Sequence, residues 1–263
     1  MMDSPSASNH RDPEVKARFS QALSLMESDR WSEAEGYLLE NCRSGCSDSM
    51  VLLGNQLSNG DYEDKRKALG WFLEAAETGD SSGMRNAGYC YALGIGCEKD
   101  KGEAVRWYRM SAERGNAKAQ CNLGVMYAYG NGVEKDEAEA AHWYLKSSEN
   151  GYSRGQTNLG VLLLEGRGVE IDKVGAEKWL RMSGTPRANY YLARLLLDPY
   201  YGNADRIEAL SLLRSSSSQG YTKAMMLLSE LISDEDGDES ERLLEEAEGI
   251  KNNRRRRRRK TED

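Results

Sequence analysis

The sequence predicts an all-α solenoid of about seven stacked antiparallel helix pairs. The first observation is a tryptophan every 36 residues, at Trp71, Trp107, Trp143 and Trp179. A period of roughly 20 to 50 residues indicates a repeat architecture. The second is a Leu-Gly or Ala-Gly pair ahead of each tryptophan, and the third is the helical spacing of the apolar residues within each repeat.

The first helix of each repeat is expected to carry a glycine where the two helices cross. Gly88, Gly124 and Gly160 recur at one phase inside segments of helical spacing. A glycine within a helix costs about 0.5–1 kcal/mol relative to alanine. A glycine that recurs at a fixed phase therefore indicates a close contact, and we expect the second helix to pass over it.

A Gly-X-Gly turn is expected to end each first helix, because glycine adopts the left-handed conformation that closes a helix C-terminus. These turns occupy residues 94–96, 130–132 and 166–168. The aspartates expected to cap the following second helix are Asp100, Asp136 and Asp172. No Gly-Lys-Ser/Thr follows any of the turns, so a structural loop is favoured over a phosphate-binding loop. On the second helix, an alanine three residues before each tryptophan leaves room for the indole ring between neighbouring repeats.

Two runs of the sequence resemble the Sel-one-like repeat (SLR) family, longer-looped relatives of tetratricopeptide repeats: LGVMYAYGNGVEKDEAEAAHWYLKSSENG and GYCYALGIGCEKDKGEAVRWYRMSAERG. The match is most specific over residues 80–183 and looser over residues 46–79 and 186–220. The resemblance implies an all-helical, right-handed superhelix and a role as an adaptor or scaffold in a protein complex. It does not identify the complex.

The repeats are expected to be flanked by two disordered tails. We expect a polar N-terminal tail over residues 1–12, the repeat solenoid over residues 13–250 and an Arg-rich tail over residues 251–263. The first residues lack the apolar core of a signal peptide, and no apolar stretch reaches the length of a membrane span. We therefore expect a cytoplasmic or nuclear location.

The sequence offers little chemistry for catalysis. Of its two histidines, His10 lies in the N-terminal tail, and His142 occupies a slot that is Arg106 or Lys178 in the neighbouring repeats. The five cysteines form no disulfide framework, and no second Cys or His pair completes a metal site with Cys42 and Cys46. We expect no enzymatic activity, no metal and no cofactor.

A stripe on the first helices is the candidate partner-binding surface. Residues that are four, then three, then four apart lie on one stripe of a helix. On the first helices this stripe carries a basic residue near the start of the helix, and an asparagine follows one turn later. Asparagine amides can bond to an extended backbone, and arginine and lysine can bind carboxylates. The candidates are Asn86, Tyr89, Lys118, Asn122, Tyr129, Arg154, Asn158, Arg187 and Arg194. The predicted partner is an extended, acidic protein segment; the alternative is a solvated face with no partner.

The C-terminal residues are strongly basic, whereas the rest of the chain is acidic. Residues 251–263 hold eight basic and two acidic residues, which leaves 28 basic and 41 acidic residues, a net charge of −13, in residues 1–250. The basic run consists of Arg254, Arg255, Arg256, Arg257, Arg258, Arg259 and Lys260. It suits nuclear targeting, contact with nucleic acid or lipid phosphates, or a solvated tail against the acidic stretch before it. The leading hypothesis is an interaction scaffold; the alternative is a nucleic-acid-associated protein recruited through this run. The oligomeric state is left open.

Overall fold

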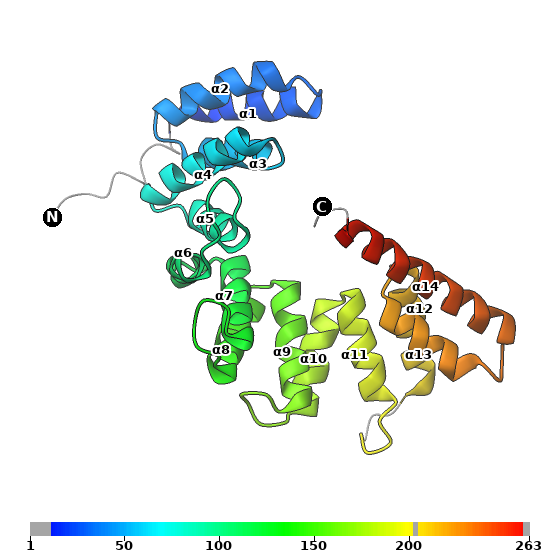
Figure 1. Ribbon diagram of the computed structural model, residues 1–263. Helices are drawn as coiled ribbons and strands as arrows, with labels where there is room; N and C mark the ends of the chain where they lie inside the picture. The colour runs from blue at the N-terminus through cyan, green and yellow to red at the C-terminus, as the bar shows by residue number, and fades with distance from the viewer. Residues whose placement is uncertain (1–11, 202–204, 260–263) are drawn as a thin grey trace. The chain divides into compact units, whose positions relative to one another are not determined.

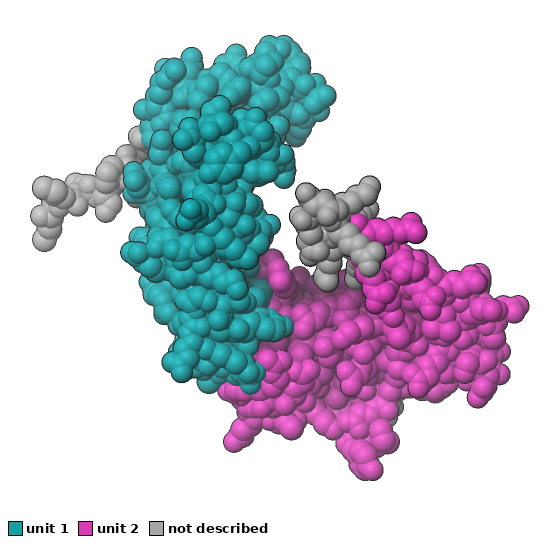
Figure 2. Space-filling view, in the orientation of Figure 1, with its two compact units in different colours: residues 1–150 teal, residues 151–263 magenta. Residues whose placement is uncertain are grey.

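The structure, a computed structural model, describes residues 12–201 and 205–259. Within these residues every regular element is a helix, fourteen in all, and consecutive helices within each compact unit pack against each other (Figure 1). The chain divides into two compact units, Met1–Asn150 and Gly151–Asp263 (Figure 2). The predicted fold class, stacked helix pairs, is confirmed in each unit.

Unit 1 contains four helix pairs: α1 (Pro13–Glu27), α2 (Trp31–Arg43), α3 (Ser47–Leu57), α4 (Tyr62–Glu77), α5 (Ser81–Leu93), α6 (Lys101–Glu113), α7 (Ala117–Tyr129) and α8 (Glu137–Glu149). Unit 2 contains three: α9 (Ser153–Glu165), α10 (Lys173–Ser183), α11 (Pro186–Leu196), α12 (Arg206–Ser218), α13 (Thr222–Ile232) and α14 (Gly237–Arg259). Odd-numbered helices are the first helices of their repeats, and even-numbered helices are the second.

In the four repeats that carry the glycine, from α3/α4 to α9/α10, the second helix lies over the glycine of the first, as predicted. A methyl group built on Gly124 would lie 2.7 Å from the ring of Tyr144, and one built on Gly88 would lie 2.8 Å from the ring of Tyr108. The residue that covers the glycine is the one directly after the repeat's tryptophan. The pairs are Gly54–Phe72, Gly88–Tyr108, Gly124–Tyr144 and Gly160–Leu180.

Two of the four repeat tryptophans, Trp71 and Trp107, pack against the preceding repeat. Trp107 of α6 contacts the buried cluster that holds Phe72 of α4 and Cys90 of α5. Trp71 of α4 contacts the cluster that holds Leu38 of α2 and Leu53 of α3. An indole thus reaches back to the preceding repeat, because the alanine one turn earlier leaves space for the ring.

The turns and caps also form as predicted. Gly94, Gly130 and Gly166 close their helices in the left-handed conformation, with φ of 78°, 65° and 64°. Asp100, Asp136 and Asp172 each accept hydrogen bonds from the first-turn amides of the second helix. The third residue of each turn has a further constraint in unit 1. Methyl groups on Gly96 and Gly132 would overlap the carbonyls of Lys65 and Lys101, which belong to the second helix of the preceding repeat.

A serine near the end of four second helices, α6, α8, α10 and α12, closes its own pair. The Ser147 hydroxyl donates to the carbonyl oxygen of Ala117 at 2.7 Å, and Ser147 is fully buried. The equivalent bonds are Ser111–Ser81, Ser183–Ser153 and Ser216–Pro186. Each joins the last turn of the second helix to the first residue of the first helix, which fixes the two helices antiparallel.

The C-terminal region differs from the expectation. Residues 251–259 continue α14, where the sequence analysis expected a disordered tail. Arginine is a good helix former. Acidic residues in the first turn of a helix and basic residues at its C-terminal end also interact favourably with the helix dipole. The inner half of α14 packs on α13 through Ala247 and the bond between the Ser229 and Ser240 hydroxyls. Lys260 and the expected N-terminal tail, apart from Asp12, lie outside the described residues.

Candidate functional site

In unit 1, some residues of the predicted stripe are exposed to solvent and others are hydrogen-bonded to neighbouring helices. Tyr89, Lys118 and Tyr129 are exposed on successive first helices α5 and α7, and Tyr129 exposes 67% of its surface. Asn86 is buried, and its amide nitrogen donates to Asn55 Oδ1 on α3 at 3.2 Å. Asn122 is half-buried and hydrogen-bonds to the side chain of Tyr108.

In unit 2 the stripe brings three arginines onto two first helices. Arg154 and Asn158 lie on α9, and Arg187 and Arg194 lie on α11. Arg154 and Arg194 are exposed, Arg187 is half-buried and Asn158 is buried. Arg187 Nη1 donates to Asn158 Oδ1 at 2.9 Å, so this asparagine holds an arginine of the next repeat. Asn86 and Asn158 thus brace neighbouring first helices, because the stripe position turns inward where two repeats meet.

Two of these arginines stack on one tyrosine. The guanidinium carbon atoms of Arg187 and Arg194 lie 5.6 and 5.9 Å from the ring centroid of Tyr191. Arg194 also lies 5.7 Å from the ring of Tyr190. Distances below about 6 Å are favourable for cation–π attraction, each contact stabilising by about 0.5–1 kcal/mol at an exposed site. The stack holds both guanidinium groups in place before any partner arrives.

The arginines of residues 151–220 fall into two groups. Four are paired with carboxylates: Arg167 with Glu165, Arg181 with Glu177 and Glu208, Arg206 with Glu235, and Arg214 with Glu239. The other three are Arg154, Arg187 and Arg194, and none of them has a carboxylate partner among the residues that the structure describes. Carboxylates are plentiful in a chain of net charge −7, so the lack of a carboxylate partner for these three arginines on two first helices is a distinctive feature of this face.

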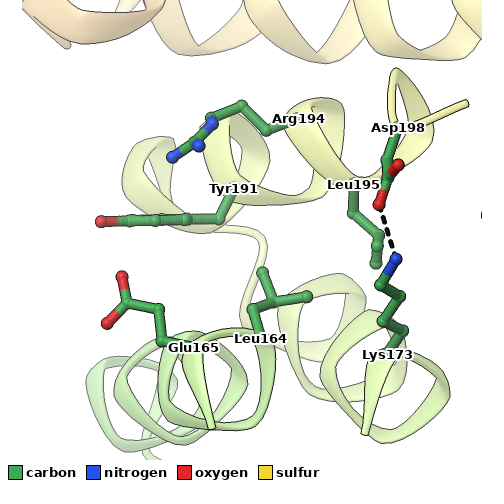
Figure 3. Close-up of a pocket in the computed structure, with 7 residues that line it drawn as sticks. All are labelled: Leu164, Glu165, Lys173, Tyr191, Arg194, Leu195 and Asp198. Atoms are coloured by element: carbon green, nitrogen blue, oxygen red, sulfur yellow. Dashed lines mark hydrogen bonds and ion pairs between the residues drawn. The ribbon is translucent and has the colours of Figure 1, made fainter. Parts of the chain in front are cut away.

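A small hollow lies beside this stack (Figure 3). It measures about 280 Å³ and is lined by Leu164, Glu165, Lys173, Tyr191, Arg194, Leu195 and Asp198. Leu164 and Leu195 form an apolar floor. At one end Lys173 Nζ donates to Asp198 Oδ2 at 2.6 Å. This bond, together with the Tyr200 amide, lowers the pKa of the Asp198 carboxyl from its usual value of 3.8.

A second hollow of about 420 Å³ lies at the other end of α11. Its lining residues are Arg154, Thr157, Thr185, Pro186, Arg187, Gln219, Gly220 and Tyr221. The ring of Tyr221 lies 5.5 Å from that of Tyr190, which continues the aromatic cluster. The three unpaired arginines therefore border both hollows, Arg154 and Arg187 at one and Arg194 at the other.

Sequence reasoning missed Tyr190, Tyr221 and Lys173. Tyr190 lies beside the stripe and Tyr221 lies in the turn before α13, where the repeat match is loose, so no repeated pattern indicated them. The signal that was available is the pair Tyr190-Tyr191, which stands where other repeats have a single asparagine. Lys173 starts a second helix, and only the fold brings it to Asp198.

No arrangement for catalysis or metal binding emerges from the described residues. His142 is exposed and lies edge-on to Trp143, with ring centroids 5.4 Å apart. Groups of three or more potential metal ligands are absent from this part of the chain. None of its helices is long and apolar enough to cross a membrane. All five cysteines are free thiols, and burial raises the pKa of Cys42 and Cys90 to about 12.

Comparison with known families agrees with this architecture. A model of the Sel1 repeat matches residues 47–80, 81–116, 117–152, 153–184 and 186–221, which is more than half of the chain. The chain belongs to the Sel1 repeat family. Sel1 repeat proteins generally mediate protein–protein interactions, and their fold is typically a non-catalytic scaffold. The family implies protein partners for this chain.

Two solved Sel1-type structures are similar to the chain. A Sel1 repeat protein from Oxalobacter formigenes has a TM-score of 0.79 and 24% identity, over 88% of this chain and 99% of that chain. A protective antigen of uropathogenic Escherichia coli, which displays an SLR fold, has a TM-score of 0.76 and 26% identity, over 89% of this chain. This chain covers 54% of the antigen's length. Among curated protein sequences, none matches significantly.

Proposed function

We propose that this Sel1 repeat chain is a non-enzymatic adaptor whose first-helix face in unit 2 binds an extended, acidic segment of a partner protein. The division of the arginines supports the proposal: those on the second helices and loops are paired with carboxylates, and those on the first helices are not. An unpaired, stacked arginine gives up few internal contacts when it binds a carboxylate. The exposed Tyr89, Lys118 and Tyr129 occupy the corresponding face in unit 1.

Selection of peptides from a random ten-residue library, displayed on phage, against the full chain tests the proposal. We expect the selected peptides to be rich in Asp and Glu. The double variant Arg154→Glu/Arg194→Glu reverses two exposed cations, keeps the bond between Arg187 and Asn158, and gives up the stacking of Arg194 on Tyr190 and Tyr191. An exposed ion pair contributes up to about 1 kcal/mol, so losing two should weaken binding by about 2 kcal/mol, roughly 30-fold.

The matched control is Lys99→Glu/Lys178→Glu, which makes the same change in net charge on a repeat loop and on the second helix α10. Both lysines are exposed. The control should bind the selected peptides as wild type does. Peptides without acidic bias, or equal losses in the two double variants, would contradict the proposal, since binding would then depend on total charge or on another surface.

We also propose that the basic run sets the location of the protein by acting as a nuclear-targeting signal. The run lies at the free end of α14, and Arg255 and Arg256 are exposed there. A fluorescent fusion of the full chain should concentrate in the nucleus of a eukaryotic cell. The same fusion with alanine at residues 254–259 should be evenly distributed. Identical distributions of the two fusions would remove the targeting role.

The alternative is recruitment to nucleic acid through the same run. The net charge of −13 on residues 1–250 repels a polyanion, which favours targeting over stable phosphate binding. Retention on immobilised RNA, weakened by salt and lost on alanine substitution of residues 254–259, would support the alternative instead.

A further inference from the structure

The hollow beside Tyr191 is small and partly apolar. Pockets for small molecules usually measure about 300–1,000 Å³, and this one measures about 280 Å³. Its floor is apolar, formed by Leu164 and the buried Leu195, and the Tyr191 ring forms one wall (Figure 3). The apolar floor and the aromatic wall suit an aliphatic or aromatic side chain.

The two carboxylates that line the hollow are already paired. Glu165 is paired with Arg167 at 3.2 Å, and Asp198 accepts from Lys173 at 2.6 Å. Lys173 is therefore engaged inside the hollow, and Arg194 is the lining cation that has no carboxylate partner among the described residues. In Figure 3 the Arg194 guanidinium and the Glu165 carboxylate lie on opposite sides of the Tyr191 ring. An acidic neighbour can therefore reach Arg194 while an uncharged side chain fills the hollow.

We propose that this hollow is an anchor pocket that takes one apolar side chain of the acidic segment, an inference that rests on the proposed function. The position of the acidic residues follows from α11. Arg187 and Leu195 are eight residues apart on this helix, about 12 Å along its axis. An extended chain covers that distance in about four residues. The partner motif is therefore an acidic residue near Arg187 and Arg154, followed or preceded about four positions away by an apolar residue.

The test uses the selected acidic peptides and replaces their apolar residue with serine. Binding of labelled peptides to the full chain is measured by fluorescence anisotropy. We expect serine to weaken binding to wild type about tenfold. The Tyr191→Ala variant removes the wall of the hollow, so it should discriminate little between the apolar and serine peptides. Its fold is checked by circular dichroism and by its urea midpoint.

A charge exchange provides a second measurement that does not alter the wall. A peptide with glutamate in place of its apolar residue should bind wild type worst, and Glu165→Gln should recover part of this binding. Glu170→Gln removes an exposed carboxylate outside the hollow and should recover none. Recovery confined to Glu165→Gln supports the anchor pocket.

The outcomes separate this inference from the proposed function. Acidic peptides that lose affinity for Arg154→Glu/Arg194→Glu, yet bind equally well with serine at the apolar position, would overturn the anchor pocket alone. Equal recovery in Glu165→Gln and Glu170→Gln would also overturn it. A library that yields no acidic peptides would remove the proposed function, and the anchor pocket with it.

Discussion

The loop glycine Gly132 gives the sharpest test of how neighbouring repeats are held together. It has a φ of +72°, and a methyl group on it would overlap the Lys101 carbonyl and lie 2.8 Å from the Gly102 nitrogen. Gly115 provides a matched control in the same unit. Its φ is +83°, and nothing lies within 4 Å of a methyl group built there. Both glycines therefore have a left-handed backbone, but only Gly132 has other atoms close to the position of the added methyl group.

Replacing each glycine with alanine separates the cost of the left-handed backbone from the cost of the steric overlap. A left-handed conformation costs an L-residue about 1–2 kcal/mol, and we expect Gly115→Ala to lose only this. Gly132→Ala must in addition move the loop by roughly 1 Å to reach an ordinary carbon separation of about 3.5 Å. Overpacking of this kind costs about 1–3 kcal/mol. The total for Gly132→Ala is about 2–5 kcal/mol.

Urea unfolding followed by tryptophan fluorescence and circular dichroism measures the difference. With a slope of about 1–3 kcal/mol per molar urea, an extra 2 kcal/mol lowers the midpoint by about 1 M. Because a repeat array can unfold in segments, the two probes should be compared in each variant. Equal midpoints for Gly115→Ala and Gly132→Ala would refute the reasoning, since the loop would then adapt to the methyl group without loss.

Two further predictions concern buried polar groups. Ser147→Ala should lower the free energy of unfolding by about 1 kcal/mol, because it leaves the Ala117 carbonyl without its hydroxyl donor. The control Ser58→Ala loses only a local bond at an exposed helix end and should change the urea midpoint little. Equal effects of the two variants would contradict a stabilising role of the buried serine bond. Cys42 and Cys90, with a pKa of about 12, should react slowly with a thiol reagent at pH 8 until urea exposes them. Since the unfolded thiols ionise at the ordinary pKa of 9.0 and the folded thiols do not, stability should fall as pH rises from about 9 towards 12, and Cys42→Ala/Cys90→Ala should reduce that fall. A midpoint that stays constant over this range would contradict the pKa shifts.

Much of the candidate site was accessible from the pattern of residues. Arg154, Arg187 and Arg194 follow from helical spacing within a repeat, because residues four and three apart share a helix face. What spacing cannot show is which of them already has a partner. That Arg206 is paired and Arg194 is not depends on where Glu235 lies, and Glu235 is 29 residues further along the chain.

The roles of the asparagines also lay beyond sequence reasoning. Asn86 and Asn158 share the stripe with exposed residues, yet both are buried because neighbouring first helices meet at this position. Their amides bond to Asn55 and Arg187, which lie 31 and 29 residues away. Only the stacking of one repeat on the next decides whether such a residue faces a partner or another helix.

The sequence by itself determined the repeat: its period, its helix pairs, the glycine crossings, the left-handed turns and the aspartate caps. Each of these depends on residues within one helix or one turn, where local geometry is set by a few neighbouring side chains. The tertiary structure decided the serine bonds within four of the helix pairs, the overlap that a methyl group on Gly132 would create, the continuation of α14 into the arginine run and the hollow beside Tyr191. These features depend on the distance between atoms of different helices, and that distance is established only when the helices pack.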